Sequence, residues 1–192
     1  TAAHIESAEG VRVGLEAGVD TIEHGADLTP ELIALFKENG VGRKSSLTCT
    51  VSPALPFVEL DPEKTHSTEI QKVNGNIVYK GIVHAAQAAL EAGIPVGLGT
   101  DSACPYVTHY DMWREVVYFE RIVGAPRKLA LHTATLGNAH ILGLGKETGS
   151  IEEGKTADLI VLDENPLENL EALRQVKMVM ARGKLVSGLS VK

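Results

Sequence analysis

The sequence predicts an α/β protein in which helices alternate with the strands of a parallel sheet, followed by a smaller β-rich segment. The order helix, glycine, strand occurs three times in the same direction, at residues 15–19, 90–94 and, more loosely, 38–41. Repeated units of this kind are typical of a parallel sheet. The run 93–102 is apolar and ends in the carboxylate of Asp101, at the position where parallel sheets carry their chemistry. From Gly149 onward, the pattern changes to that of β-strands.

The first part of the chain alternates helices and strands. Ser7 is expected to cap a helix that ends near Gly18, because apolar residues recur at helical spacing between them. A strand over residues 19–23 should follow. Thr29, followed directly by proline, predicts a second helix that ends near Gly40.

The middle of the chain contains a weaker strand, a loop and a long helix. A strand is expected from residue 41 to residue 47, although Arg43 and Lys44 are polar. Segment 51–64 contains three prolines, which predict a loop. Apolar residues at helical spacing then predict a long helix from about residue 70 to Gly93.

The last part of the chain changes from helices to strands. A loop rich in proline, tyrosine and histidine is expected over 102–111, and helices are expected over 112–123, 126–135 and 138–142. Strands are expected over 157–163, 176–180 and 185–186, with a hairpin turn at 182–184. We expect these strands to belong to a separate small β domain.

Composition restricts the partners and the location. Twenty-five acidic residues against 18 basic ones give a net charge of -7, which disfavours binding to nucleic acid or to an anionic membrane surface. No apolar run is long enough to span a membrane. Two cysteines, Cys49 and Cys104, provide no disulfide framework. Cys104 is expected to be a buried, inert thiol, with a place near a functional site as the alternative. The sequence therefore favours a cytoplasmic protein.

Three polar side chains, His4, His24 and Asp101, lie at or just beyond the ends of predicted parallel strands. Because strand ends meet at one rim, residues far apart in sequence can share one ion there. Imidazole and carboxylate together suit a divalent metal such as Zn²⁺. Taken singly, Asp101 also suits a capping residue and each histidine a packed or solvated side chain, but the three together favour a metal site.

The ordered motifs of the chain strongly resemble the amidohydrolase superfamily, within it the imidazolonepropionase-related and Xaa-Pro-dipeptidase-like branch. The motifs are His4, Leu-Glu-Ala-Gly-Val-Asp-Thr-Ile-Glu-His-Gly at 15–25, Gly-Thr-Asp at 99–101, His-Thr-Ala-Thr at 132–135 and Gly-Ser-Ile-Glu-Glu-Gly-Lys-Thr-Ala-Asp-Leu at 149–159. This resemblance covers nearly the whole chain.

The resemblance implies a metal-dependent (βα)8 TIM-like barrel with a small β-sandwich, of which this chain matches the second half. His4 would then close strand five, His24 strand six and Asp101 strand eight. The family's His-x-His pair and its carboxylated lysine have no counterpart among the matched motifs. Residues 1–145 would form the barrel half and residues 146–192 part of the sandwich. Strands five and eight would have open edges, so we expect a homo-oligomer or a partner that supplies the N-terminal half.

The resemblance also implies a metal-dependent amidohydrolase that cleaves a C–N bond of a small amide, cyclic amide or dipeptide substrate by activating water with one or two divalent ions, most simply Zn²⁺. His4 and His24 would hold one ion. Asp101 would bind the other and act as the catalytic base. In a single-metal version, His24 would instead orient the carbonyl or the water.

The sequence leaves open two alternative functions and the role of the loop after Asp101. The chain is either part of an active hydrolase or a catalytically silent half-barrel that lacks the ligands of strands one and four. A deaminase of the same superfamily would keep the site and release ammonia. Tyr106, His109 and Tyr110 are the expected substrate contacts, with a packed loop as the alternative.

Overall fold

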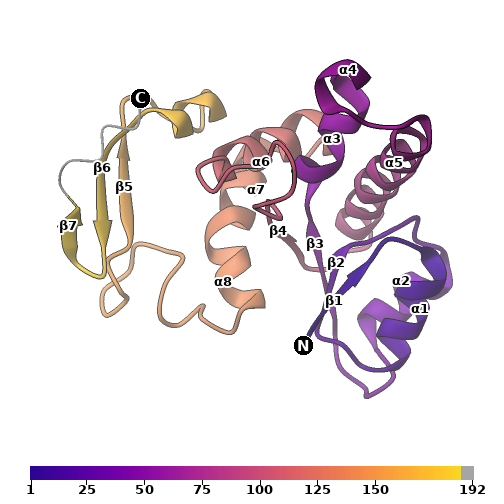
Figure 1. The fold of residues 1–192 in the computed structure, drawn as a ribbon. Coiled ribbons are helices and arrows are strands. Elements are labelled where there is room, and N and C mark those ends of the chain that lie inside the picture. The colour runs from indigo at the N-terminus through magenta and orange to yellow at the C-terminus, as the bar shows by residue number, and fades with distance from the viewer. Residues whose placement is uncertain (187–192) are drawn as a thin grey trace.

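A computed structural model of the protein describes residues 1–186. Its first sheet has four parallel strands in sequence order: β1 (Ala2–Ile5), β2 (Thr21–His24), β3 (Ser46–Cys49) and β4 (Val96–Leu98). Helices precede and follow these strands along the chain (Figure 1). The predicted α/β fold with a parallel sheet is therefore confirmed, and β1 and β4 form the two edges, as expected for one half of a barrel.

The first two helices begin where the sequence predicts. In α1 (Ala8–Glu16), the Ser7 hydroxyl accepts a hydrogen bond from the amide of Gly10. In α2 (Pro30–Lys37), the hydroxyl of Thr29 accepts one from the amide of Leu32. These caps satisfy amides that have no partner inside their helix.

The third expected helix–glycine–strand junction differs from the other two. Gly18 and Gly93 follow their helices with φ angles of 81° and 69°, the left-handed conformation in which glycine ends a helix. Gly40 instead lies against α1, where a Cβ atom would be 1.7 Å from the carbonyl oxygen of Glu16. The predicted strand from residue 41 is wrong, because the Asn39 side chain accepts from the amides of Val41 and Arg43 and closes a turn there. Strand β3 therefore begins only at Ser46.

The predicted loop at 51–64 is also wrong. It contains α3 (Val51–Glu59) and the short α4 (Pro62–Thr65). Pro53 lies in the first turn of α3, where a missing N–H costs little, and Pro56 lies inside this short helix. Val51, Ala54 and Leu55 are buried in the core, so packing outweighs the prolines.

The long helix is confirmed as α5 (Glu69–Glu91), which packs along α3. Thr68 and Gln71 form a reciprocal capping box at its start. Ile82, Ala85 and Ala89 form part of its buried face against the sheet.

The helices after β4 follow the prediction, with two π-helical turns added. They are α6 (Met112–Tyr118), the π-helix η1 (Phe119–Val123), α7 (Arg127–His132), the π-helix η2 (Thr133–Gly137) and α8 (Asn138–Ile141). The Asn138 side chain donates to the carbonyl of Leu98 and accepts from its amide, both at 2.9 Å. One side chain thus pairs with part of the edge of β4 that was expected to be open.

A second sheet is antiparallel and lies beyond the helices that follow β4 (Figure 1). Its strands are β5 (Leu159–Leu162), β6 (Val176–Ala181) and β7 (Lys184–Val186), and the 3-10 helix η3 (Leu170–Arg174) lies between the first two. Arg182 and Gly183 both have positive φ angles at the predicted hairpin turn. The division of the chain into a barrel half that ends at residue 145 and a sandwich part that begins at residue 146 stays a prediction. Residues 187–192 of the predicted sandwich part lie outside the described residues. Within residues 1–186, no helix is long and apolar enough to cross a membrane.

Candidate metal centre

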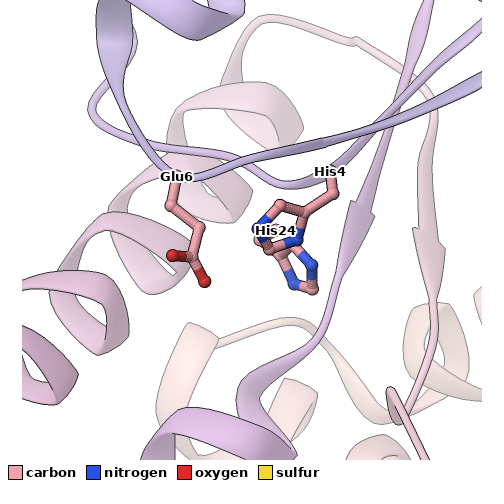
Figure 2. A group of neighbouring side chains, drawn as sticks. All are labelled: His4, Glu6 and His24. Carbon is pink, nitrogen blue, oxygen red and sulfur yellow. The ribbon is translucent and has the colours of Figure 1, made fainter.

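His4, Glu6 and His24 bring their side chains together at the carboxyl end of two neighbouring strands. His4 lies in β1, Glu6 follows the end of that strand, and His24 is the last residue of β2. Their candidate ligand atoms all lie within 4.8 Å of one another. The two rings meet edge to face with centroids 4.7 Å apart, and the Glu6 carboxylate lies to one side of them (Figure 2).

The His24 ring is held by a contact from Thr50 to one of its two nitrogen atoms. Its side chain is buried, with 6 % of the residue exposed, and its Nδ1 atom lies 2.7 Å from the hydroxyl oxygen of Thr50. This contact leaves Nε2 as the atom available for a metal. Burial lowers the pKa of His24, and the neighbouring His4 lowers it further. Asp101, Glu6 and Glu23 act in the opposite direction.

Asp101 lies on the same rim but outside the three-residue group. It is exposed, and its carboxylate accepts a hydrogen bond from the Cys104 thiol at 3.2 Å. Cys104 is partly exposed, so the expectation of a buried thiol is wrong, and its contact with Asp101 agrees with the alternative that it lies near the site. Burial and the contact with Asp101 raise the pKa of Cys104 to about 11, so it stays a neutral thiol.

His24 and Asp101 share an unusual backbone conformation. Their φ angles are 70° and 51°, in the left-handed region that residues other than glycine seldom occupy. Outliers of this kind gather at functional sites, where the surrounding structure holds the strained residue in place. Among the described residues, His66, Ala103, Tyr106 and Arg182 also have positive φ angles, so this conformation shows strain at His24 and Asp101 but does not single them out.

The three predicted substrate contacts lie in the loop after Asp101 but do not share one hollow. Tyr106 donates a hydrogen bond from its hydroxyl to the carbonyl of Lys64 and lines a hollow beside α3. Tyr110 is 80 % exposed and lines a neighbouring hollow with Trp113. His109 is exposed and lines neither. Their role as substrate contacts stays a prediction.

Three residues around this site were missed by reasoning from the sequence. Glu6 lies two positions after His4, and its place just beyond a strand end was a signal that could have found it. Thr50 directly follows β3, but the strand was expected to end earlier. Glu115 accepts hydrogen bonds from the amides of the two residues that follow Thr50. No local sequence pattern could have identified it, because these partners are 63 and 64 residues away.

The donor set fits a divalent metal. Two imidazoles and a carboxylate are common protein ligands of Zn²⁺. They converge within one ion's reach, and one ring nitrogen of His24 is already engaged by the protein, as is usual for a metal-bound histidine.

Known proteins resemble this chain over most of its length. A family model described as "Amidohydrolase family" matches residues 2–186. A solved structure described as "putative prolidase from Bifidobacterium longum" superimposes with a TM-score of 0.95 at 45% identity, covering 97% of this chain and 46% of that one. A Xaa-Pro dipeptidase with bound methionine gives a TM-score of 0.81 at 34% identity, covering 97% and 44%. Ochratoxinase of Aspergillus niger is 30% identical over 97% of this chain and 38% of its own length. The chain thus spans less than half of these relatives.

Proposed function

This chain belongs to the amidohydrolase family, and from that premise we propose that the protein is a metal-dependent hydrolase of the C–N bond in a small amide, with dipeptides as the substrate class. The observation that carries the proposal is the convergence of His4, Glu6 and His24, whose ligand atoms lie within 4.8 Å of one another. Two neighbouring parallel strands provide these side chains, at the rim where barrel enzymes bind their substrates.

Each residue has a distinct task in the proposed reaction. His4 and His24 hold a divalent ion, for which we propose Zn²⁺, and Glu6 is a further candidate ligand. The bound ion would lower the pKa of a water molecule and polarise the scissile carbonyl. Asp101 accepts the proton of the attacking water and delivers it to the leaving amine, a task open to an exposed carboxylate on the same rim. A second ion, bound by Asp101, belongs to the same proposal.

The substrate class rests on two of the similar structures. One is described as a putative prolidase and the other as a Xaa-Pro dipeptidase, at 45% and 34% identity. We therefore place a dipeptide ahead of a cyclic amide or a deaminase substrate, which would use the same ligands with a different leaving group. Tyr106, His109 and Tyr110 are proposed to contact that substrate.

The assembly is part of the proposal, because the family's other ligands have no counterpart in the chain's motifs. Either a partner or a further part of the protein would complete the barrel at the edges of β1 and β4, and we propose a homo-oligomer in solution. Without that completion, the chain alone would be catalytically silent. A cytoplasmic location is also proposed, supported by Cys49 and Cys104 being free thiols.

Metal analysis of the intact protein tests the proposal. We expect His24→Ala to lose zinc at the site and His84→Ala, the matched control, to keep it, because His84 lies on the exposed side of α5 beside Asp27. Dipeptides should be hydrolysed by the control and not by His24→Ala. Equal zinc content in the two variants would refute the assignment of His24 as a ligand.

A further inference from the structure

The side chain of Glu115 is completely buried, although it carries a carboxyl group and lies on α6, away from the metal centre in sequence. Its two oxygens accept hydrogen bonds from the amides of Val51 and Ser52, at 2.6 and 2.9 Å, and one of them also accepts from the Ser52 hydroxyl. These amides open helix α3, so Glu115 caps that helix from a different part of the chain.

The residue that normally caps such a helix is Thr50. Threonine at this position usually accepts a hydrogen bond from an amide of the first turn. Thr29 and Thr68 do so for α2 and α5. Thr50 makes no such bond, and its hydroxyl oxygen instead lies 2.7 Å from Nδ1 of His24.

The start of α3 is suited to this exchange of partners. Its third residue is Pro53, which has no N–H, so the first-turn amides that need an acceptor near the start are those of Val51 and Ser52. Glu115 takes both. The Thr50 hydroxyl is left with no amide to cap and is available to the histidine.

We propose that Glu115 is a positioning residue for the candidate metal ligand His24: it caps α3 in place of Thr50 and so reserves the Thr50 hydroxyl for the imidazole. This inference rests on the proposed function only in that His24 binds the metal. Groups that orient a metal-bound histidine through its other nitrogen typically change metal affinity about 10- to 100-fold when removed.

Loss of the Glu115 carboxylate would make the two roles of Thr50 compete. The amides of Val51 and Ser52 would lose an acceptor inside the protein, where an unpaired amide is costly. The Thr50 hydroxyl is the nearest N-cap group and could turn to them, away from His24. The imidazole would then lose its orienting contact even though neither His24 nor Thr50 had been changed.

The test measures zinc affinity in the intact protein by competition with a chromophoric chelator, at the site that His24→Ala abolishes. We expect Thr50→Val to weaken binding about tenfold or more, and Thr50→Ser, which keeps a hydroxyl, to retain it. Glu115→Gln should weaken binding by several-fold to about tenfold. In a Thr50→Val background, Glu115→Gln should have almost no further effect, because the contact it protects is already gone.

Controls separate positioning from general stability. Thr68→Val removes the cap of α5, so it should lower the unfolding midpoint and leave zinc affinity unchanged. If Glu115→Gln does not fold, Ser52→Ala serves in its place, since it removes one donor to the carboxylate and should show a smaller effect with the same dependence on Thr50.

Two outcomes would overturn the inference while leaving the proposed function intact. One is a Glu115→Gln protein that binds zinc as tightly as wild type. The other is an equal loss of affinity with and without the Thr50 hydroxyl, which would make Glu115 a purely structural residue. If His24→Ala itself binds zinc normally, the proposed function fails first, and the two failures are thereby distinguished.

Discussion

Glu115→Gln should change how the stability of the protein depends on pH. Burial raises the pKa of Glu115 from 4.5 to about 7, although its bonds from Ser52 and from the amide of Val51 act in the lowering direction. The folded protein therefore holds this proton more tightly than the unfolded chain does. The stabilisation from protonated Glu115 is fully present below about pH 4.5 and is lost as the pH rises through about 7.

The size of the effect follows from this shift. One pKa unit corresponds to about 1.4 kcal/mol, so the shift is worth roughly 3 kcal/mol, of which roughly 2 to 3 kcal/mol falls between pH 5 and pH 8. The free energy of unfolding should be measured in urea at both pH values for wild type and Glu115→Gln. We expect the substitution to cost more at pH 5 than at pH 8 by that amount. Taking the difference in the free energy of unfolding between the variant and wild type removes the contribution of histidine titration, which both proteins share.

An equal cost at both pH values, or a larger one at pH 8, would refute this reasoning. It would mean that Glu115 is ionised across the range, because the donors from Val51 and Ser52 outweigh the burial of the carboxylate. Carboxylates that accept two or three amide hydrogen bonds can behave in this way. The measurement therefore decides which of two opposing physical effects dominates at the start of α3.

Two further predictions concern the proposed base and a close backbone contact. Asp101→Asn should lower kcat for dipeptide hydrolysis by about 10²- to 10⁴-fold while zinc at His4 and His24 is retained; undiminished turnover would exclude Asp101 as the base. Gly40→Ala should destabilise the fold by about 3 kcal/mol or more in urea unfolding, because the new Cβ would lie 1.7 Å from the carbonyl oxygen of Glu16. Gly93→Ala, where the space is open and only the φ angle of 69° resists, should cost about 1 to 2 kcal/mol; a larger cost than for Gly40 would contradict this order.

The fold could be predicted from the sequence wherever the signal is local. Ser7 and Thr29 begin their helices as expected, because an N-cap needs only the amides two or three residues ahead. The parallel sheet could be predicted from the repeated order of helix, glycine and strand, in which Gly18 and Gly93 end their helices. His24 lies at the end of the strand expected over 19–23, whereas the strand that carries His4 follows only from the family resemblance.

The errors arise where contacts between distant parts of the chain, or a turn that the sequence pattern did not reveal, override the local pattern. Prolines predicted a loop at 51–64, but the core residues of α3 and the cap from Glu115 hold a helix there. Thr50 was missed because the strand before it was placed too early. Glu6 was missed because an exposed glutamate carries no periodic signal, and only the position of its neighbours distinguishes it.

The rim of the sheet is held in an unfavourable conformation by the core directly below it. His24 and Asp101 have left-handed backbones, each costing about 1 to 2 kcal/mol relative to a relaxed residue. Glycine at either position would remove that cost, but it would also remove a ligand or a base. The strands beneath them bury Ile22, Leu47 and Leu98 almost completely, and burial of one such side chain contributes about 1.5 to 3 kcal/mol. Burial of Ile22 in β2 and of Leu98 in β4 is therefore large enough to offset the backbone strain at His24 and at Asp101, respectively.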